Sequence, residues 1–159
     1  MPTIVFLHAH PDDEASQTSG SMARAVDDGH RVVVVFATNG DHGEAPDDLA
    51  PGETVVDRRR SEAAASAAAI GLHRVVWLGY ADSGMSGWEQ NSHEEAFAAA
   101  PLEQAAARFA AVLDGSRPTS RSGTTGTEAT ATPTTCRCTA CCTAVPSWRH
   151  APPGCWSRR

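Results

Sequence analysis

The sequence of 159 residues contains no lysine, so all 13 of its basic side chains are arginines. With 19 acidic side chains the formal net charge is -6, whereas proteins that bind nucleic acid usually carry a basic excess. No apolar run approaches the roughly 18 residues that a transmembrane helix needs. The first apolar stretch, which ends at Leu7, is too short for the core of a signal peptide. These absences argue against a nucleic-acid-binding or membrane-spanning protein and predict a cytoplasmic one.

Cysteine is absent before Cys136, and all five cysteines fall at or after that residue. Charge is divided just as unevenly. Residues 1–117 contain 18 acidic and 8 basic side chains, whereas residues 118–159 contain one acidic and five basic side chains. The second part is rich in threonine and shows neither a helical nor a strand period. The two parts therefore have unrelated compositions, and residues 1–117 are expected to form the structured domain.

Residues 1–117 alternate between short apolar runs and longer amphipathic segments. Runs rich in β-branched residues predict buried strands at Thr3–Leu7, Arg31–Ala37 and Arg74–Leu78. Helices are expected at Ser16–Asp28, Thr54–Ile70 and Pro101–Leu113. Strands separated by helices form right-handed βαβ units. The predicted fold class is therefore α/β, a Rossmann-like parallel sheet with flanking helices, incomplete after the third strand and followed by an irregular tail.

Three polar segments follow the predicted strands: His8–Glu14, Thr38–Glu53 and Gly79–Ala100. In open parallel sheets the functional crevice lies beyond the carboxyl ends of the strands. The second and third segments are also longer than connections in compact domains usually are. We therefore expect the functional residues in these three segments.

The first segment, His8-Ala9-His10-Pro11-Asp12-Asp13-Glu14, carries two histidines and three adjacent acids. A histidine nitrogen and a carboxylate oxygen from one tight turn can meet one metal ion, and this donor chemistry suits zinc. A neighbouring carboxylate that is not a ligand can then act as general base toward a metal-bound water. The same residues also fit the ordinary start of a helix, where the helix dipole favours acids. The residues alone leave both interpretations open.

This segment, placed directly after an N-terminal strand, resembles the motif of the PIG-L/LmbE family of zinc-dependent de-N-acetylases. The resemblance implies hydrolysis of the acetamide of N-acetylglucosamine-type sugars, including intermediates of mycothiol synthesis. It implies one zinc ion as cofactor and a small-molecule amino-sugar conjugate as substrate. His10 and Asp13 would be the zinc ligands, Asp12 the general base, and Glu14 a hydrogen-bonding support behind them. His8 receives no metal-binding role.

Three further segments resemble the family in the same order: Thr38–Glu44 (TNGDHGE), Arg59–Glu62 (RRSE) and Leu78–Met85 (LGYADSGM). The resemblance implies that Arg59 and Asp82 contact the hydroxyl groups of the substrate. Without it, Arg59 could be a solvated helix residue, and Asp82 could form a turn before Ser-Gly. Solvated or surface positions are expected for His42, Glu44, His73 and His93.

In this family the third zinc ligand belongs to an H-P-D-H motif after a fourth strand, and the chain has no such motif. A frame shifted by one base can spell YDWHGGYGHPDHVQVH across Gly123–Thr139, with HPDH at Ala131–Thr135, if third codon bases are chosen freely. We therefore hypothesise a one-base slip in the coding sequence near Pro118. Residues 118–159 would then be an out-of-frame, disordered tail, and the nucleotide sequence tests this.

Under this hypothesis selection has not shaped the cluster of four cysteines: Cys136, Cys138, Cys141 and Cys142. The spacing of these cysteines is also not that of a zinc ribbon. His150 could replace the third ligand only by accident. Two functions follow: a zinc-dependent deacetylase impaired by the missing ligand, or an inactive, truncated fragment of such an enzyme. A nucleotide-binding domain is disfavoured, because an acidic first loop without glycine would repel a pyrophosphate. The exact substrate and the oligomeric state are left open.

Overall fold

The computed structural model describes residues 1–116 and 120–123, with backbone alone for the last four. Two strands and two helical segments make up the first part: β1 (Thr3–His8), η1 (Glu14–Thr18, a π-helical turn), α1 (Ser19–Asp27) and β2 (Arg31–Thr38). The remaining elements are α2 (Val55–Ile70), β3 (Arg74–Tyr80), η2 (Glu89–Ser92, a 3-10 turn), α3 (Leu102–Ser116) and β4 (Ser120–Gly123).

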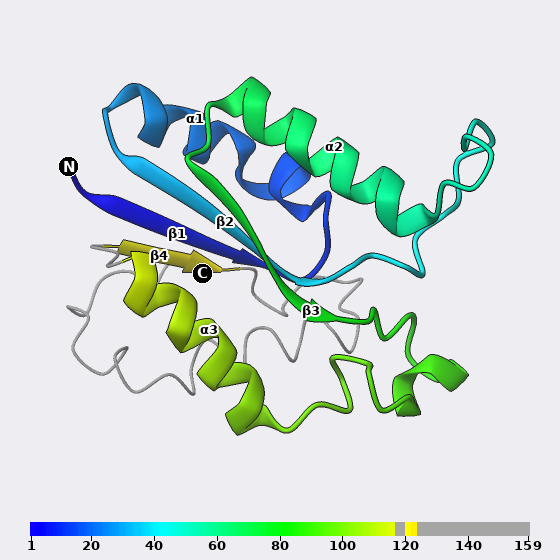
Figure 1. Cartoon of the computed structure of the whole chain (residues 1–159). Helices are drawn as coiled ribbons and strands as arrows, with labels where there is room; N and C mark the ends of the chain where they lie inside the picture. Colours follow the sequence, from blue (N-terminus) through cyan, green and yellow to red (C-terminus); the bar gives the residue numbers. More distant parts are fainter. Residues whose placement is uncertain (117–119, 124–159) are drawn as a thin grey trace.

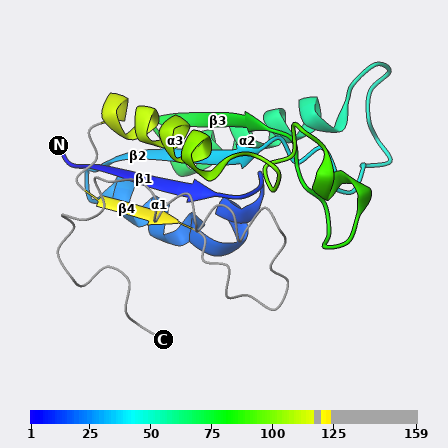
Figure 2. The ribbon, with the colours of Figure 1, turned by 90° about the horizontal axis from the view of Figure 1, so that it is seen from below.

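The strands form one parallel sheet in the order β3-β2-β1-β4. Figure 1 shows α1 and α2 on one face of the sheet and α3 on the other. Figure 2, seen from below, shows the four strands in this order with their arrows pointing the same way. The predicted α/β fold with a Rossmann-like parallel sheet and flanking helices is confirmed. No helix in the described part of the chain is both long and apolar enough to cross a bilayer.

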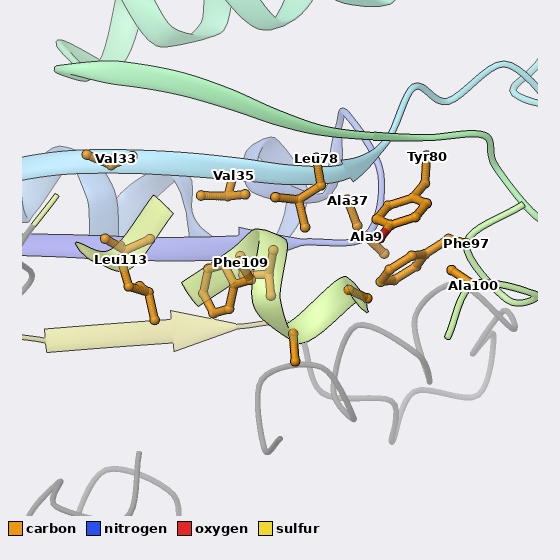
Figure 3. Close-up of a cluster of buried hydrophobic side chains, with 14 residues drawn as sticks. Ala9, Val33, Val35, Ala37, Leu78, Tyr80, Phe97, Ala100, Phe109 and Leu113 are labelled. Atoms are coloured by element: carbon orange, nitrogen blue, oxygen red, sulfur yellow. The ribbon is translucent and has the colours of Figure 1, made fainter. Parts of the chain in front are cut away.

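The central strand β2 is buried on both faces, which explains its continuous apolar run. Alternate side chains of a strand point to opposite faces. Val33, Val35 and Ala37 belong to the cluster that packs against α3, together with Phe109 and Leu113 of that helix (Figure 3). Val32, Val34 and Phe36 belong to the cluster under α1 and α2, which also contains Met22 and Ala63. The sheet is therefore the middle layer of three.

The structure differs from the predicted irregular tail at Ser120–Gly123, which form β4 beside β1. Parallel pairing joins backbone groups, so a short segment without large apolar residues can occupy the free edge of β1. The remaining predictions for the tail, including those for its cysteines and for His150, lie outside the described residues.

The carboxyl ends of β1, β2 and β3 lie at the same edge of the sheet, on the right in Figure 1. Two hydrogen bonds join the segments that leave these strands. The Thr38 hydroxyl donates to the Ala9 carbonyl at 2.9 Å, and the Asn39 amide donates to the Tyr80 carbonyl at 3.0 Å. The three polar segments singled out in the sequence therefore leave the sheet side by side.

Candidate active site

A cavity of about 200 Å³ lies beyond this edge of the sheet. All three polar segments and helix α2 contribute to its wall, with His10, Asp12, His42, Arg59, Asp82 and Trp88 among the lining residues. Residues separated by more than 70 positions in the chain thus face one space. Such a crevice at the carboxyl edge of a parallel sheet is the usual place for a ligand in this class of fold.

His10 lies between two carboxylates inside this cavity. Its Nε2 is 3.3 Å from Asp82 Oδ1, and its Nδ1 is 3.6 Å from Asp13 Oδ2. Burial alone would lower the pKa of His10, but the hydrogen bonds and charges of Asp13 and Asp82 outweigh it and raise the pKa to about 10. Without a metal, His10 is therefore an imidazolium held between two acids.

Asp13 does not behave as an ordinary helix-capping residue. It stands at the N-cap position of η1, yet its side chain makes no capping hydrogen bond. Its Oδ2 instead accepts the His10 backbone amide at 2.9 Å, and its Oδ1 accepts from Gln17 Nε2 at 3.0 Å. Burial raises the pKa of Asp13, but the bonds with His10 lower it further and keep the carboxylate ionised. The Asp13 carboxylate is therefore held by His10 and Gln17 rather than used to cap the helix.

Asp12 occupies a backbone conformation that side-chain-bearing residues rarely adopt, with φ at 120°. Its amide donates to Glu14 Oε2 at 2.9 Å, and the other oxygen of this buried carboxylate accepts from the Ser66 hydroxyl of α2 at 2.9 Å. Such strain is maintained only where the surroundings fix it, and it is common at functional sites. Glu14 thus ties the strained turn to helix α2.

The Asp12 carboxylate lies at the mouth of the cavity. Partial desolvation, and then the neighbouring charge of Asp13, raise the pKa of Asp12, while Arg59 opposes this. Arg59 Nη1 is 3.9 Å from Asp12 Oδ2 and 3.1 Å from Glu62 Oε2. Because the Arg59 side chain is only 21% exposed and lines the cavity, it is not simply a solvated helix residue.

Asp82 makes the turn contact that the sequence allowed and also lies at the cavity. Its Oδ1 accepts the Gly84 amide at 3.1 Å, which is the turn-forming contact expected before Ser-Gly. The same carboxylate faces His10, and the residue is buried at the cavity wall. The turn therefore fixes the orientation of a carboxylate that faces His10 at the cavity wall.

Several residues of the site were not singled out by the sequence. Asp41 Oδ1 accepts the Asp82 amide at 2.8 Å and so joins the second polar segment to the third. His42, expected to be solvated, is half-buried in the cavity wall. Gly40 has φ at +67°, and a Cβ there would lie 2.7 Å from Pro11 Cγ. The resemblance of Thr38–Glu44 to the family's glycine-containing loop was the available signal for this group.

The predicted surface positions agree with the structure, since Glu44, His73 and His93 are exposed. His8 is fully buried, and its Nε2 lies 2.9 Å from the Thr18 hydroxyl. Burial lowers the pKa of His8, which favours the neutral ring. His8 does not line the cavity.

The donor chemistry at the turn fits zinc at two positions, His10 and Asp13. A catalytic zinc usually takes three protein ligands and keeps a further position for water. Within residues 1–116 and 120–123, no group of three or more histidine, cysteine, aspartate or glutamate side chains is arranged to hold a metal ion. Among the described residues, His10 and Asp13 are therefore two donors that zinc could take, short of the usual three.

These features define an α/β domain in which histidine, carboxylates and arginine surround a crevice at the edge of a parallel sheet. Residues 5–120 match the PIG-L family, described as GlcNAc-PI de-N-acetylase, and the chain belongs to this family. The family indicated by the sequence motifs is confirmed.

Curated relatives support the same assignment. The chain is 37% identical over 127 residues to the 1D-myo-inositol 2-acetamido-2-deoxy-alpha-D-glucopyranoside deacetylase of Thermobifida fusca, covering 72% of this chain and 44% of that protein. It is 36% identical over 125 residues to the enzyme of the same name from Saccharomonospora viridis, covering 72% and 47%. The chain thus spans less than half the length of these curated relatives.

Solved structures show the same fold. The N,N'-diacetylchitobiose deacetylase of Pyrococcus horikoshii superimposes with a TM-score of 0.71 at 21% identity, covering 95% of this chain and 51% of that one. The 4-carboxy-2-hydroxymuconate hydratase of Pseudomonas putida gives a TM-score of 0.53 at 24% identity, covering 74% and 45%. Because a deacetylase and a hydratase share this fold, the fold by itself does not decide the reaction.

Proposed function

We propose that this site removes the acetyl group from an N-acetylglucosamine-type amino-sugar conjugate by zinc-dependent hydrolysis. The observation that carries the proposal is the convergence of His10, Asp12, Arg59 and Asp82 on one cavity. Membership of a de-N-acetylase family and similarity to deacetylases of an acetamido sugar linked to inositol support the substrate class.

His10 and Asp13 would hold the zinc ion, because a neutral imidazole and a carboxylate are both zinc donors and lie on one turn. When bound, zinc lowers the pKa of a coordinated water and polarises a carbonyl group. Zinc binding requires His10 to lose a proton, and Asp13 and Asp82 stabilise the protonated form of its ring.

Asp12 would act as the general base. Water would add to the acetyl carbonyl carbon while Asp12 takes its proton, and the C–N bond would then break as Asp12 passes this proton on to the leaving amine. Arg59, at 3.9 Å, favours the charged form of Asp12 that this first step needs. Glu14 would support the turn by holding the Asp12 amide.

Arg59 and Asp82 would bind the sugar. The Arg59 guanidinium offers N–H donors and the Asp82 carboxylate offers acceptor oxygens, so together they match hydroxyl groups, which can both accept and donate. Both residues line the cavity that also contains Asp12. The reacting acetamide would then lie near Asp12 with the sugar ring between these groups.

A second candidate is that this chain is catalytically inactive. The described residues contain no complete group of three metal donors, and two ligands hold zinc less tightly than three. The family fold would then be present without the reaction.

Zinc content and acetate release separate these candidates. We expect the purified full chain, supplied with zinc, to bind the metal and to release acetate from an N-acetylglucosamine conjugate. His10→Gln should lose the zinc, whereas Asp12→Asn should keep it and lose activity by about 100-fold or more. Asp47→Asn, which changes an exposed carboxylate of the second polar segment, is the control and should change neither quantity. Zinc-loaded chain that releases no acetate at high concentration would contradict the deacetylase proposal and favour the inactive one.

A further inference from the structure

One part of the cavity wall is apolar, in contrast to the charged residues that line the rest of it. In the described part of the chain, the exposed large apolar side chains are Met1, Met85 and Trp88. Met85 is 52% exposed and Trp88 is 49% exposed, and both line the cavity. Large apolar side chains kept exposed beside a polar cavity point to contact with a ligand.

The segment that carries Trp88 is fixed by Asn91 of η2. Asn91 Oδ1 accepts the Gly87 amide at 2.9 Å, and its Nδ2 donates to the carbonyls of Ser83 and Met85. The Trp88 amide also donates to the Met85 carbonyl at 3.1 Å. The turn is therefore ordered before any ligand arrives, which reduces the entropy lost on binding.

The indole of Trp88 packs directly on the backbone at Gly84. A Cβ at Gly84 would lie 2.6 Å from Trp88 Cε3, and the φ of +65° at this residue also favours glycine. Gly84 in turn follows Asp82, whose carboxylate accepts its amide. The position of the indole is thus coupled to a polar group of the site, while half of the Trp88 side chain remains exposed.

The size of the cavity limits what it can enclose. At about 200 Å³ it is smaller than the roughly 300–1,000 Å³ of pockets that enclose drug-sized ligands. The charged wall around Asp12, Arg59 and Asp82 suits one polar sugar. A ring attached to that sugar would then have the exposed side chains of Met85 and Trp88 as its apolar neighbours on the cavity wall.

We propose that Trp88 forms a second subsite, which binds the ring attached to the amino sugar by stacking the apolar C–H face of that ring on the exposed indole. The inference rests on the proposed function for the placement of the reacting sugar. It narrows the substrate class to conjugates of at least two rings and predicts that free N-acetylglucosamine binds weakly.

Binding to the zinc-free full chain tests the subsite without any dependence on hydrolysis. Affinities for N-acetylglucosamine and for its two-ring form, N,N'-diacetylchitobiose, would be measured by ligand-observed NMR in the presence of a chelator. We expect the disaccharide to bind about tenfold more tightly, in line with the usual energy of an aromatic contact. Trp88→Ala should remove this difference and leave the affinity for the monosaccharide within twofold, while Trp88→Phe should retain most of it.

Glu89→Ala is the matched control, because Glu89 is exposed and adjacent to Trp88 in the same turn. It should leave both affinities unchanged. Equal weakening of both sugars by Trp88→Ala, no effect on either sugar, or no binding of the disaccharide by the unaltered chain would each overturn the subsite. A chain that binds as expected but releases no acetate when loaded with zinc would contradict the proposed reaction and leave the subsite standing.

Discussion

The strained turn at Asp12 is held by one buried carboxylate that joins two segments. Glu14 accepts the Asp12 amide with one oxygen and the Ser66 hydroxyl with the other. Because φ at Asp12 is 120°, the turn would relax if this support were lost. Under the proposed function, Ser66 is therefore a positioning residue that acts on Asp12 through Glu14.

Ser66→Ala should lower kcat about tenfold and leave KM nearly unchanged, since Asp12 would lose its orientation while Arg59 and Asp82 still bind the sugar. Ser66→Thr, which keeps the hydroxyl, should recover most of the rate. Ser61→Ala is the matched control, because Ser61 is on the same helix but exposed. Steady-state kinetics of the zinc-loaded chain measure kcat and KM for each variant. A change in KM alone would contradict the positioning role.

A second prediction at the residue scale concerns the close approach of Gly40 and Pro11. Gly40→Ala combines an unfavourable φ of +67° with a Cβ only 2.7 Å from Pro11 Cγ. We expect a loss of about 2–4 kcal/mol in the free energy of unfolding, because backbone strain and overpacking add.

Gly52→Ala separates these two contributions. Gly52 has a similar φ of +85°, but nothing lies within 4 Å of its Cβ position. Gly52→Ala should therefore lower the free energy of unfolding by only about 1 kcal/mol, because of its backbone conformation. Urea unfolding of both variants measures the difference, and equal losses would show that the contact with Pro11 contributes nothing.

The sequence predicted part of the site at this scale and missed the rest for a physical reason. His10, Asp12 and Asp13 lie within one short motif, so their proximity follows from the covalent chain. Ser66 lies on a helix of mostly alanine, and only the packing of α2 against the first turn brings its hydroxyl to Glu14. The position of Trp88 likewise depends on how its loop packs against Gly84, which the sequence does not reveal.

At the scale of elements, helix α2 is defined by a capping box at its first turn. The Thr54 hydroxyl accepts the Asp57 amide at 3.1 Å, and Asp57 Oδ2 accepts the Thr54 amide at 3.1 Å. Gly71, with φ at +81°, ends the helix in the left-handed conformation. Since α2 carries both Arg59 and Ser66, its ends determine where these two side chains lie.

Thr54→Ala should destabilise the chain by about 1 kcal/mol, the usual cost of losing an N-cap side chain. Thr54→Ser keeps the hydroxyl and should restore most of that loss. Chemical unfolding measures both variants, and an unchanged free energy in Thr54→Ala would show that water replaces the cap without cost.

The predicted elements agree with the observed strands and helices except where local patterns are weak. The runs of β2 and β3 are long and apolar, so their positions follow from the sequence. The helix after β1 begins instead with the π-helical turn Glu14–Thr18, which apolar spacing does not reveal. The four-residue strand β4 was missed, because backbone pairing with β1 rather than its own side chains defines it.

At the scale of the whole molecule, the His10 ion pairs make stability depend on pH when no metal is bound. The pKa of His10 is raised from 6.5 to about 10, so the folded chain binds this proton more tightly than the unfolded chain. The stabilisation of the folded chain by protonated His10 is fully present below pH 6.5 and is lost as the pH rises toward 10. The free energy of unfolding in chelator should therefore decrease over this range.

His10→Gln should remove this decrease, and His73→Gln, which changes an exposed histidine, should retain it. Urea unfolding of the zinc-free proteins at several pH values provides the measurement. An identical pH slope in the unaltered chain and in His10→Gln would contradict the assignment.

The composition change near Pro118 leads to a prediction about the coding sequence. The family match ends at residue 120, close to the point where the acidic, patterned composition ends. We propose that a one-base slip there removes the HPDH motif. Correcting the frame should yield a chain that binds zinc more tightly and releases acetate faster, as measured by metal titration and acetate assay. Nucleotides that spell HPDH in no frame would contradict this.

The position of β1 in the sheet has a consequence for synthesis. β1 is made first, yet it pairs on one side with β2 and on the other with β4, where Ile4 lies opposite Ser120. A ribosome therefore releases β1, β2 and β3 with their helices long before the second partner of β1 is translated. During that interval one edge of β1 presents unpaired backbone groups, so the nascent chain should be most prone to association with other chains just before residue 120 emerges.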